Sequence, residues 1–201
     1  MKGITLILIA AIILAFVVQL AVPDVTDAFA LQDVAAQPWT LVTSMFLHGS
    51  LNHLLGNIFA LLIFGLLLEN EVGSKRFLII YMVGGIVAGI ASSFFYASSL
   101  GASGAIFAVI GALAVMKPKM TVFAYGVPMP MIVAALFWLM LDIAGVFYPT
   151  NIANMAHIAG LAFGAVVGFA IWQKKPKEPK HEKKARTISN EDFNQWEEEW
   201  M

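Results

Sequence analysis

The 201-residue sequence contains no cysteine. This absence excludes disulfide bonds, thiolate catalysis and cysteine-ligated zinc, and it leaves the redox compartment undetermined. Charged residues are also scarce, at 12% of the chain, against about 25% in an ordinary soluble domain. With 60% hydrophobic residues and a mean hydropathy of +0.81, the chain is too apolar for a soluble domain. Its net charge of −1 gives no reason to expect a nucleic-acid partner.

Long apolar runs predict membrane-spanning helices, because a span needs roughly 20 apolar residues at 1.5 Å rise per residue. The first run could instead belong to a signal peptide, but its length favours a retained span. We therefore expect an all-α, polytopic membrane bundle of six transmembrane helices in residues 1–172, followed by a charged, disordered tail at 173–201. The six predicted spans are 4–22, 51–68, 77–97, 103–116, 131–147 and 153–172.

The basic residues are distributed on one side of this predicted topology. All 12 Lys and Arg residues fall in the N-terminus, the loops at 69–76 and 117–119, and the tail. Six spans place these segments together, and the positive-inside rule assigns that side to the cytoplasm. We therefore expect an integral, multi-pass protein of the cell membrane with both termini cytoplasmic.

Polar side chains within the spans are few, and such residues are functional candidates because burying them in a membrane is costly. All of them fall near the predicted outer ends of their spans. The run at 103–116 is too short to cross about 30 Å of hydrocarbon, so its first residue lies below the headgroups, which indicates an aqueous pocket. The candidates are His48, His53, Asn57, Ser103, Asp142, Asn154 and His157.

Ser103 lies in a run of small residues, at the predicted first turn of a helix. Small neighbours such as Gly101 and Gly104 let a substrate or another helix approach the hydroxyl closely. Gly160 and Gly164 form a similar ridge after His157, so the two helices can pack tightly. A serine hydroxyl needs an adjacent base, and a neutral imidazole is the usual one.

His53 and Asn57 are four residues apart and therefore share one helix face. Both can donate hydrogen bonds. Together with the backbone N–H of Ser103, they could stabilise an oxyanion formed when the hydroxyl attacks a carbonyl group.

Other roles for these polar residues remain open. A metal site formed by three histidines and Asp142 is less favoured, because no HExxH motif is present, and neither a metal nor a cofactor is expected. His48 is better explained as a hydrogen-bonding peg between helices. Asp142 could orient His157, although a water-facing or loop-bonding role is favoured. Asn154 could be only a helix-start residue.

Three motifs of this sequence, and their order along the chain, resemble those of the rhomboid intramembrane serine proteases. The resemblance covers about residues 1–172. A glycine eight residues after the serine and a tryptophan before the first histidine also match. The motifs are G-x-S-G at Gly101–Gly104, H-x-x-x-x-H-x-x-x-N at His48, His53 and Asn57, and A-H-x-x-G-x-x-x-G at Ala156, His157, Gly160 and Gly164.

The resemblance implies a Ser–His dyad without a third acid, with Ser103 as nucleophile and His157 as general base. It implies that His53, Asn57 and backbone N–H groups form the oxyanion hole. An aromatic residue four positions after the serine would pack under the histidine; here it is Phe107, where the family commonly has tyrosine.

The resemblance also implies how substrates reach the site. The 23–49 connection would form an interfacial hairpin, and the fifth span with the 148–153 loop would act as gate and cap. The expected partners are transmembrane protein substrates, cleaved near the outer face, and the lipid bilayer. The alternative is a catalytically silent relative that binds transmembrane clients. The oligomeric state is left open.

Overall fold

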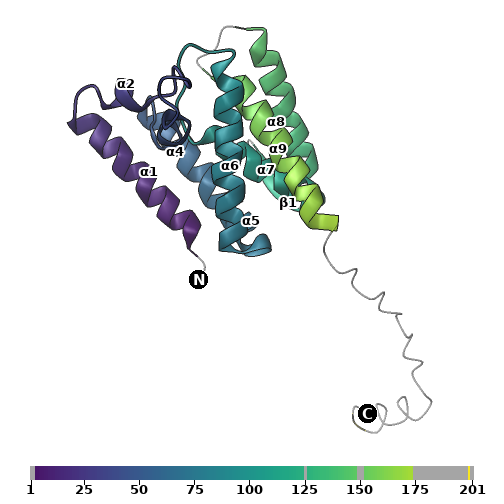
Figure 1. The fold of residues 1–201 in the computed structure, drawn as a ribbon. Coiled ribbons are helices and arrows are strands. Elements are labelled where there is room, and N and C mark those ends of the chain that lie inside the picture. The colour runs from purple at the N-terminus through teal and green to yellow at the C-terminus, as the bar shows by residue number, and fades with distance from the viewer. Residues whose placement is uncertain (1–2, 125, 149–151, 174–198, 200–201) are drawn as a thin grey trace.

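The computed structural model describes residues 3–124, 126–148, 152–173 and 199 (Figure 1). Apolar helices dominate this part of the chain, so the predicted membrane helical bundle is confirmed at that level. The predicted tail, apart from Gln173 and Glu199, lies outside the described residues, as do positions 149–151 of the predicted cap.

Among the described residues, four helical segments are long and apolar enough to cross a membrane, and two further apolar helices are shorter. The 14-residue α7 begins at Ser103, as predicted. Because two helices are below spanning length, the count of six spans stays a prediction. The long segments are α1 (Ile4–Ala21), α4–α5 (Leu51–Val72), α6 (Ser74–Ser93) and α9 (Asn154–Gln173), and the short ones are α7 (Ser103–Met116) and α8 (Met131–Val146).

The second long segment differs from its prediction. It runs without a break through α4 (Leu51–Ala60), a π-helical turn (Leu61–Gly65) and α5 (Leu66–Val72). The predicted polar loop at 69–76 was wrong, because only Gly73 separates α5 from α6. Its φ of 83° lies in the region that glycine adopts without steric cost.

Glu69 is the reason that this helix continues past its apolar run. Its carboxylate is 2% exposed, and it accepts hydrogen bonds from the backbone N–H groups of Gly3, Ile4 and Thr5 at 2.8–3.0 Å. It also accepts from the Thr5 hydroxyl at 2.7 Å and the Ser74 hydroxyl at 2.6 Å. These contacts satisfy the free N–H groups at the start of α1 and tie that helix to α5 and α6.

Two connections carry their own structure. Residues 23–49 contain the short helices α2 (Val25–Phe29) and α3 (Thr40–Thr43) and a 3₁₀ turn (Ser44–Phe46). No secondary structure was predicted for the segment between α7 and α8. It contains an antiparallel hairpin of β1 (Thr121–Ala124) and β2 (Val127–Pro130).

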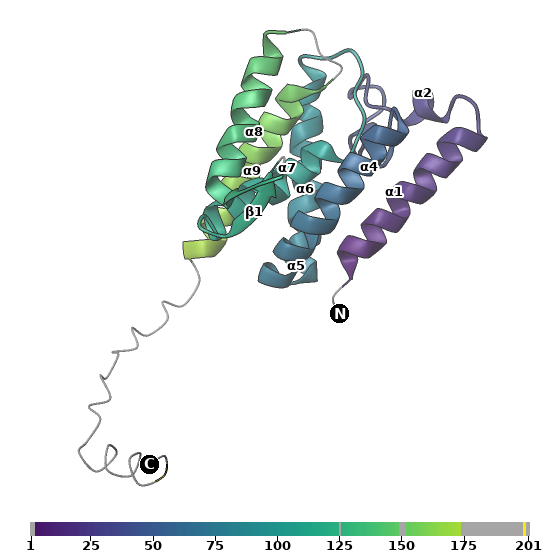
Figure 2. The ribbon, with the colours of Figure 1, turned by 180° about the vertical axis from the view of Figure 1, so that it is seen from behind.

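Helix α7 is the centre of the bundle. Eleven of its 14 residues are buried, and it packs against α6 and α9, whereas α1 lies at one edge and α8 at the other (Figures 1 and 2). The start of α1 and the end of α9 lie at the same end of the bundle, opposite to α2 (Figure 1). A short, buried central helix therefore carries Ser103 at its first position, inside the bundle.

Candidate active site

Ser103 is the first residue of α7, and the loop before it is held in place by a backbone hydrogen bond to Ser44. Gly101, with φ 126°, donates its N–H to the carbonyl of Ser44 at 2.9 Å. A Cβ atom at Gly101 would come within 2.8 Å of the His53 ring. Glycine at this position therefore supplies both the turn and the space in which His53 stands beside Ser103.

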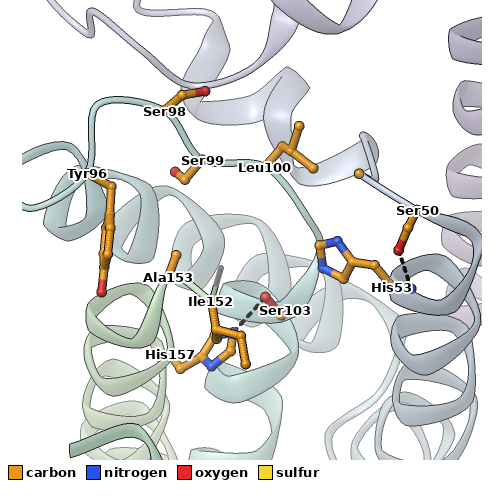
Figure 3. Close-up of a pocket in the computed structure, with 11 residues that line it drawn as sticks. Ser50, His53, Tyr96, Ser98, Ser99, Leu100, Ser103, Ile152, Ala153 and His157 are labelled. Carbon is orange, nitrogen blue, oxygen red and sulfur yellow. Dashed lines mark hydrogen bonds between the residues drawn. The ribbon is translucent and has the colours of Figure 1, made fainter. Parts of the chain in front are cut away.

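His157 lies in the first turn of α9 and faces Ser103. The distance between His157 Nε2 and Ser103 Oγ is 2.8 Å, a hydrogen-bond distance (Figure 3). The ring of Phe107, one turn after Ser103 on α7, stacks on the imidazole with a centroid distance of 4.2 Å and an interplanar angle of 4°. The stacking fixes the plane of the imidazole while leaving both ring nitrogens available.

Close packing of α7 and α9 makes this distance possible. A Cβ at Gly160 would overlap the Gly104 carbonyl, and one at Gly164 would overlap the Ala108 carbonyl. The two backbones therefore approach each other in a way that only glycine allows at these positions.

Asp142 contacts the other side of the same imidazole. Its Oδ1 lies 2.9 Å from His157 Nδ1, and the residue is only 6% exposed. The prediction that favoured a water-facing or loop-bonding role was wrong, because α8 turns this residue toward α9. Serine hydroxyl, imidazole and carboxylate thus form one continuous chain of contacts.

His53 and Asn57 occupy different positions relative to the cavity. His53 points into it from α4, and its backbone N–H is capped by the Ser50 hydroxyl at 3.2 Å (Figure 3). Asn57 is buried, and its amide donates to the His53 carbonyl at 2.9 Å. The Asn57 side chain therefore contacts the backbone of His53, and of these two residues only His53 lines the cavity.

His48 lies behind His53, and the two rings meet edge to face at a centroid distance of 5.0 Å. Two causes lower the pKa of His48 to about 4: burial of the ring is the larger, and the nearby His53 is the smaller. Gln19 accepts from the backbone N–H of His48 at 3.0 Å and donates to its carbonyl at 3.4 Å. Sequence reasoning missed Gln19, although a lone amide in an apolar run was a usable signal.

A cavity of about 820 Å³ opens above these groups. Its walls come from α4, the loop before α7 and the start of α9, and they include His53, Tyr96, Ser99, Ser103 and His157 (Figure 3). This arrangement places a hydroxyl and a base where a peptide bond and water could both reach them. Within the described ranges, no group of three or more His, Cys, Asp or Glu side chains is placed to hold a metal ion.

Comparisons with known proteins show which family this chain resembles. The family model described as the Rhomboid domain matches residues 35–174. The chain is 32% identical over 145 residues to the putative rhomboid protease YdcA of Bacillus subtilis (strain 168), covering 69% of this chain and 70% of that protein.

Two further relatives match over a similar part of the chain. The rhomboid protease GluP of Bacillus subtilis (strain 168) is 37% identical over 137 residues, which cover 66% of this chain and 26% of GluP. RHOMBOID-like protein 6, mitochondrial, of Arabidopsis thaliana is 34% identical over 138 residues, covering 67% of this chain and 44% of that protein. The chain spans less than half the length of these two relatives.

Proposed function

The chain belongs to the rhomboid family, and from this premise we propose that it is an intramembrane serine endopeptidase in which Ser103 is the nucleophile and His157 the general base. The observation that carries the proposal is the 2.8 Å contact between Ser103 Oγ and His157 Nε2 at the floor of an open cavity. A serine hydroxyl within hydrogen-bond distance of an imidazole is the arrangement that activates serine for acyl transfer.

The proposed reaction has two stages. His157 takes the proton of Ser103 as Oγ attacks the substrate carbonyl, and it then gives that proton to the leaving amine. Water attacks the resulting acyl-enzyme, again with His157 as base, and releases Ser103. Water has access to these atoms through the cavity in which both side chains lie.

The oxyanion formed in each stage needs hydrogen-bond donors. We assign this role to the His53 ring and the Ser103 backbone N–H, with the second amide hydrogen of Asn57 as a further donor. The position of His53 on the cavity wall and the bond from Asn57 to the His53 carbonyl support this assignment.

The proposal extends to the membrane topology. Residues 1–172 form a six-span protease core with cytoplasmic termini, residues 173–201 form a separate tail, and transmembrane substrates are cleaved near the outer face. The start of α1 and the end of α9 lie at the same end of the bundle (Figure 1). Helix α9 begins toward the opposite end, and His157 lies in its first turn. The distribution of Lys and Arg assigns the first of these ends to the cytoplasm.

Serine and histidine variants test the activity. Ser103→Ala and His157→Ala should each abolish cleavage of a transmembrane model substrate in liposomes, whereas Ser98→Ala, on the same cavity wall, should leave it intact. A fluorophosphonate probe should label the wild-type protein at Ser103 and label His157→Ala more slowly. Cleavage retained in both active-site variants refutes the proposal. A wild-type protein that binds transmembrane peptides without cleaving them or reacting with the probe would be the catalytically silent relative.

A further inference from the structure

We propose that Asp142 is a positioning residue for His157, so that the reacting groups form a serine–histidine–aspartate chain rather than a dyad. The inference rests on the proposed function of Ser103 and His157. Asp142 does not touch the substrate; it acts through the imidazole. Its carboxylate accepts the Nδ1–H of His157 across the 2.9 Å contact.

The contact fixes the tautomer of His157. A neutral imidazole has one N–H donor and one lone-pair acceptor, and the partner of one nitrogen determines the role of the other. A carboxylate oxygen accepts hydrogen bonds, so in the proposed arrangement Nδ1 carries the proton. The lone pair is then on Nε2, 2.8 Å from Ser103 Oγ, where it can receive the hydroxyl proton.

The packing of α8 against α9 holds Asp142 in register. A Cβ at Gly145, one turn after Asp142, would lie 2.6 Å from Asn154 Nδ2, and Asn154 lies one turn before His157. The two antiparallel helices therefore meet through two successive pairs, Asp142 with His157 and Gly145 with Asn154. Both side chains of the first pair are largely enclosed, at 9% exposed for Asp142 and 12% for His157.

The carboxylate also matters when the imidazole becomes charged. Proton transfer from Ser103 creates an imidazolium on a side chain that is only 12% exposed, and such a cation is costly without a counter-charge. The contact with Asp142 supplies that charge at the nitrogen opposite to the reaction. Phe107 stacks on the ring face and cannot supply it.

Asp142→Asn tests the inference with little change of shape. We expect kcat to fall about 10- to 100-fold, the range for one charge-assisted hydrogen bond to a group that becomes charged, while KM stays within about twofold. Ile143→Ala, at the adjacent and exposed position of α8, is the matched control and should keep wild-type kcat. Unchanged kcat in Asp142→Asn, or an equal loss in Ile143→Ala, overturns the inference.

A second readout does not depend on activity. ¹⁵N spectra of histidine-labelled protein in detergent, with His157 assigned from its Asn variant, distinguish Nδ1–H from Nε2–H. The wild-type protein should show His157 as the Nδ1–H tautomer, and the Nε2–H form overturns the inference even if Asp142→Asn does not fold. If the wild type fails to cleave and Ser103 fails to react with the probe, the proposed protease function is refuted, and the spectra still decide the role of Asp142.

Discussion

Replacing Gly164 by alanine should separate α7 from α9 and disable the site from a distance. The new Cβ would overlap the Ala108 carbonyl oxygen, and backbone atoms cannot turn aside as a flexible side chain can. An ordinary contact requires α9 to move away by about 1.5 Å, at a cost of about 1–3 kcal/mol in stability, as for other overpacked positions. His157 lies about two turns earlier on the same helix and moves with it.

This displacement lengthens the contact from His157 Nε2 to Ser103 Oγ beyond its 2.8 Å, past the range of a useful hydrogen bond. A misplacement of this size costs on the order of 10²-fold in rate. We therefore expect Gly164→Ala to lower kcat about 100-fold and to slow fluorophosphonate labelling by a similar factor. Both are measured on purified protein in detergent, beside thermal unfolding.

Two other glycines provide the comparison. At Gly168 a Cβ would lie 2.7 Å from the Ala112 carbonyl, so a smaller shift and a smaller loss are expected. At Gly56 a Cβ would meet no atom within 4 Å, and alanine there should retain activity. Equal kcat values for Gly164→Ala and Gly56→Ala would show that close approach of α7 and α9 does not position the dyad.

Three further substitutions separate stability from chemistry. Glu69→Gln should lower the stability in detergent by about 2–4 kcal/mol, because one carboxylate serves several buried donors, and it should leave the kcat of the folded fraction near wild type; an unchanged melting temperature would refute the role given to Glu69. His53→Ala should lower kcat about 10²- to 10³-fold as the loss of an oxyanion donor, and Asn57→Ala should lower it less, since Asn57 does not line the cavity. Steady-state cleavage of a transmembrane substrate compares the last two, and a larger loss in Asn57→Ala would reverse their assignment.

Hydropathy and residue spacing were enough to predict the main apolar helical segments of the described residues to within about four residues at each end, and the first residue of α7, but not the short helices α2 and α3. An apolar run that ends before Lys117 and Pro118 can form only a short helix, and small residues before Ser103 cannot continue α6. The contact between Ser103 and His157 also agrees with the glycine spacing after His157, because ridges of small residues pack against each other.

Contacts that depend on the register between distant helices could not be predicted. Asp142 faces His157 because α8 lies at one particular rotation against α9, and periodicity leaves that rotation open. The contacts of Gln19 and Glu69 could not be predicted for the same reason, because Gln19 contacts a residue 29 positions away and Glu69 contacts residues 64–66 positions away. The hairpin at 121–130 was missed because Pro128 and Pro130 argue against a strand, although edge strands tolerate proline.

The contact made by Glu69 also has a consequence for biosynthesis. Chains emerge from the ribosome N-terminus first, so α1 is complete while its anchor, more than 60 residues later, is still unmade. Until Glu69 arrives, the opening N–H groups of α1 lack their native acceptor. Helix α1 therefore gains this anchor only after α5 and the start of α6 have been synthesised.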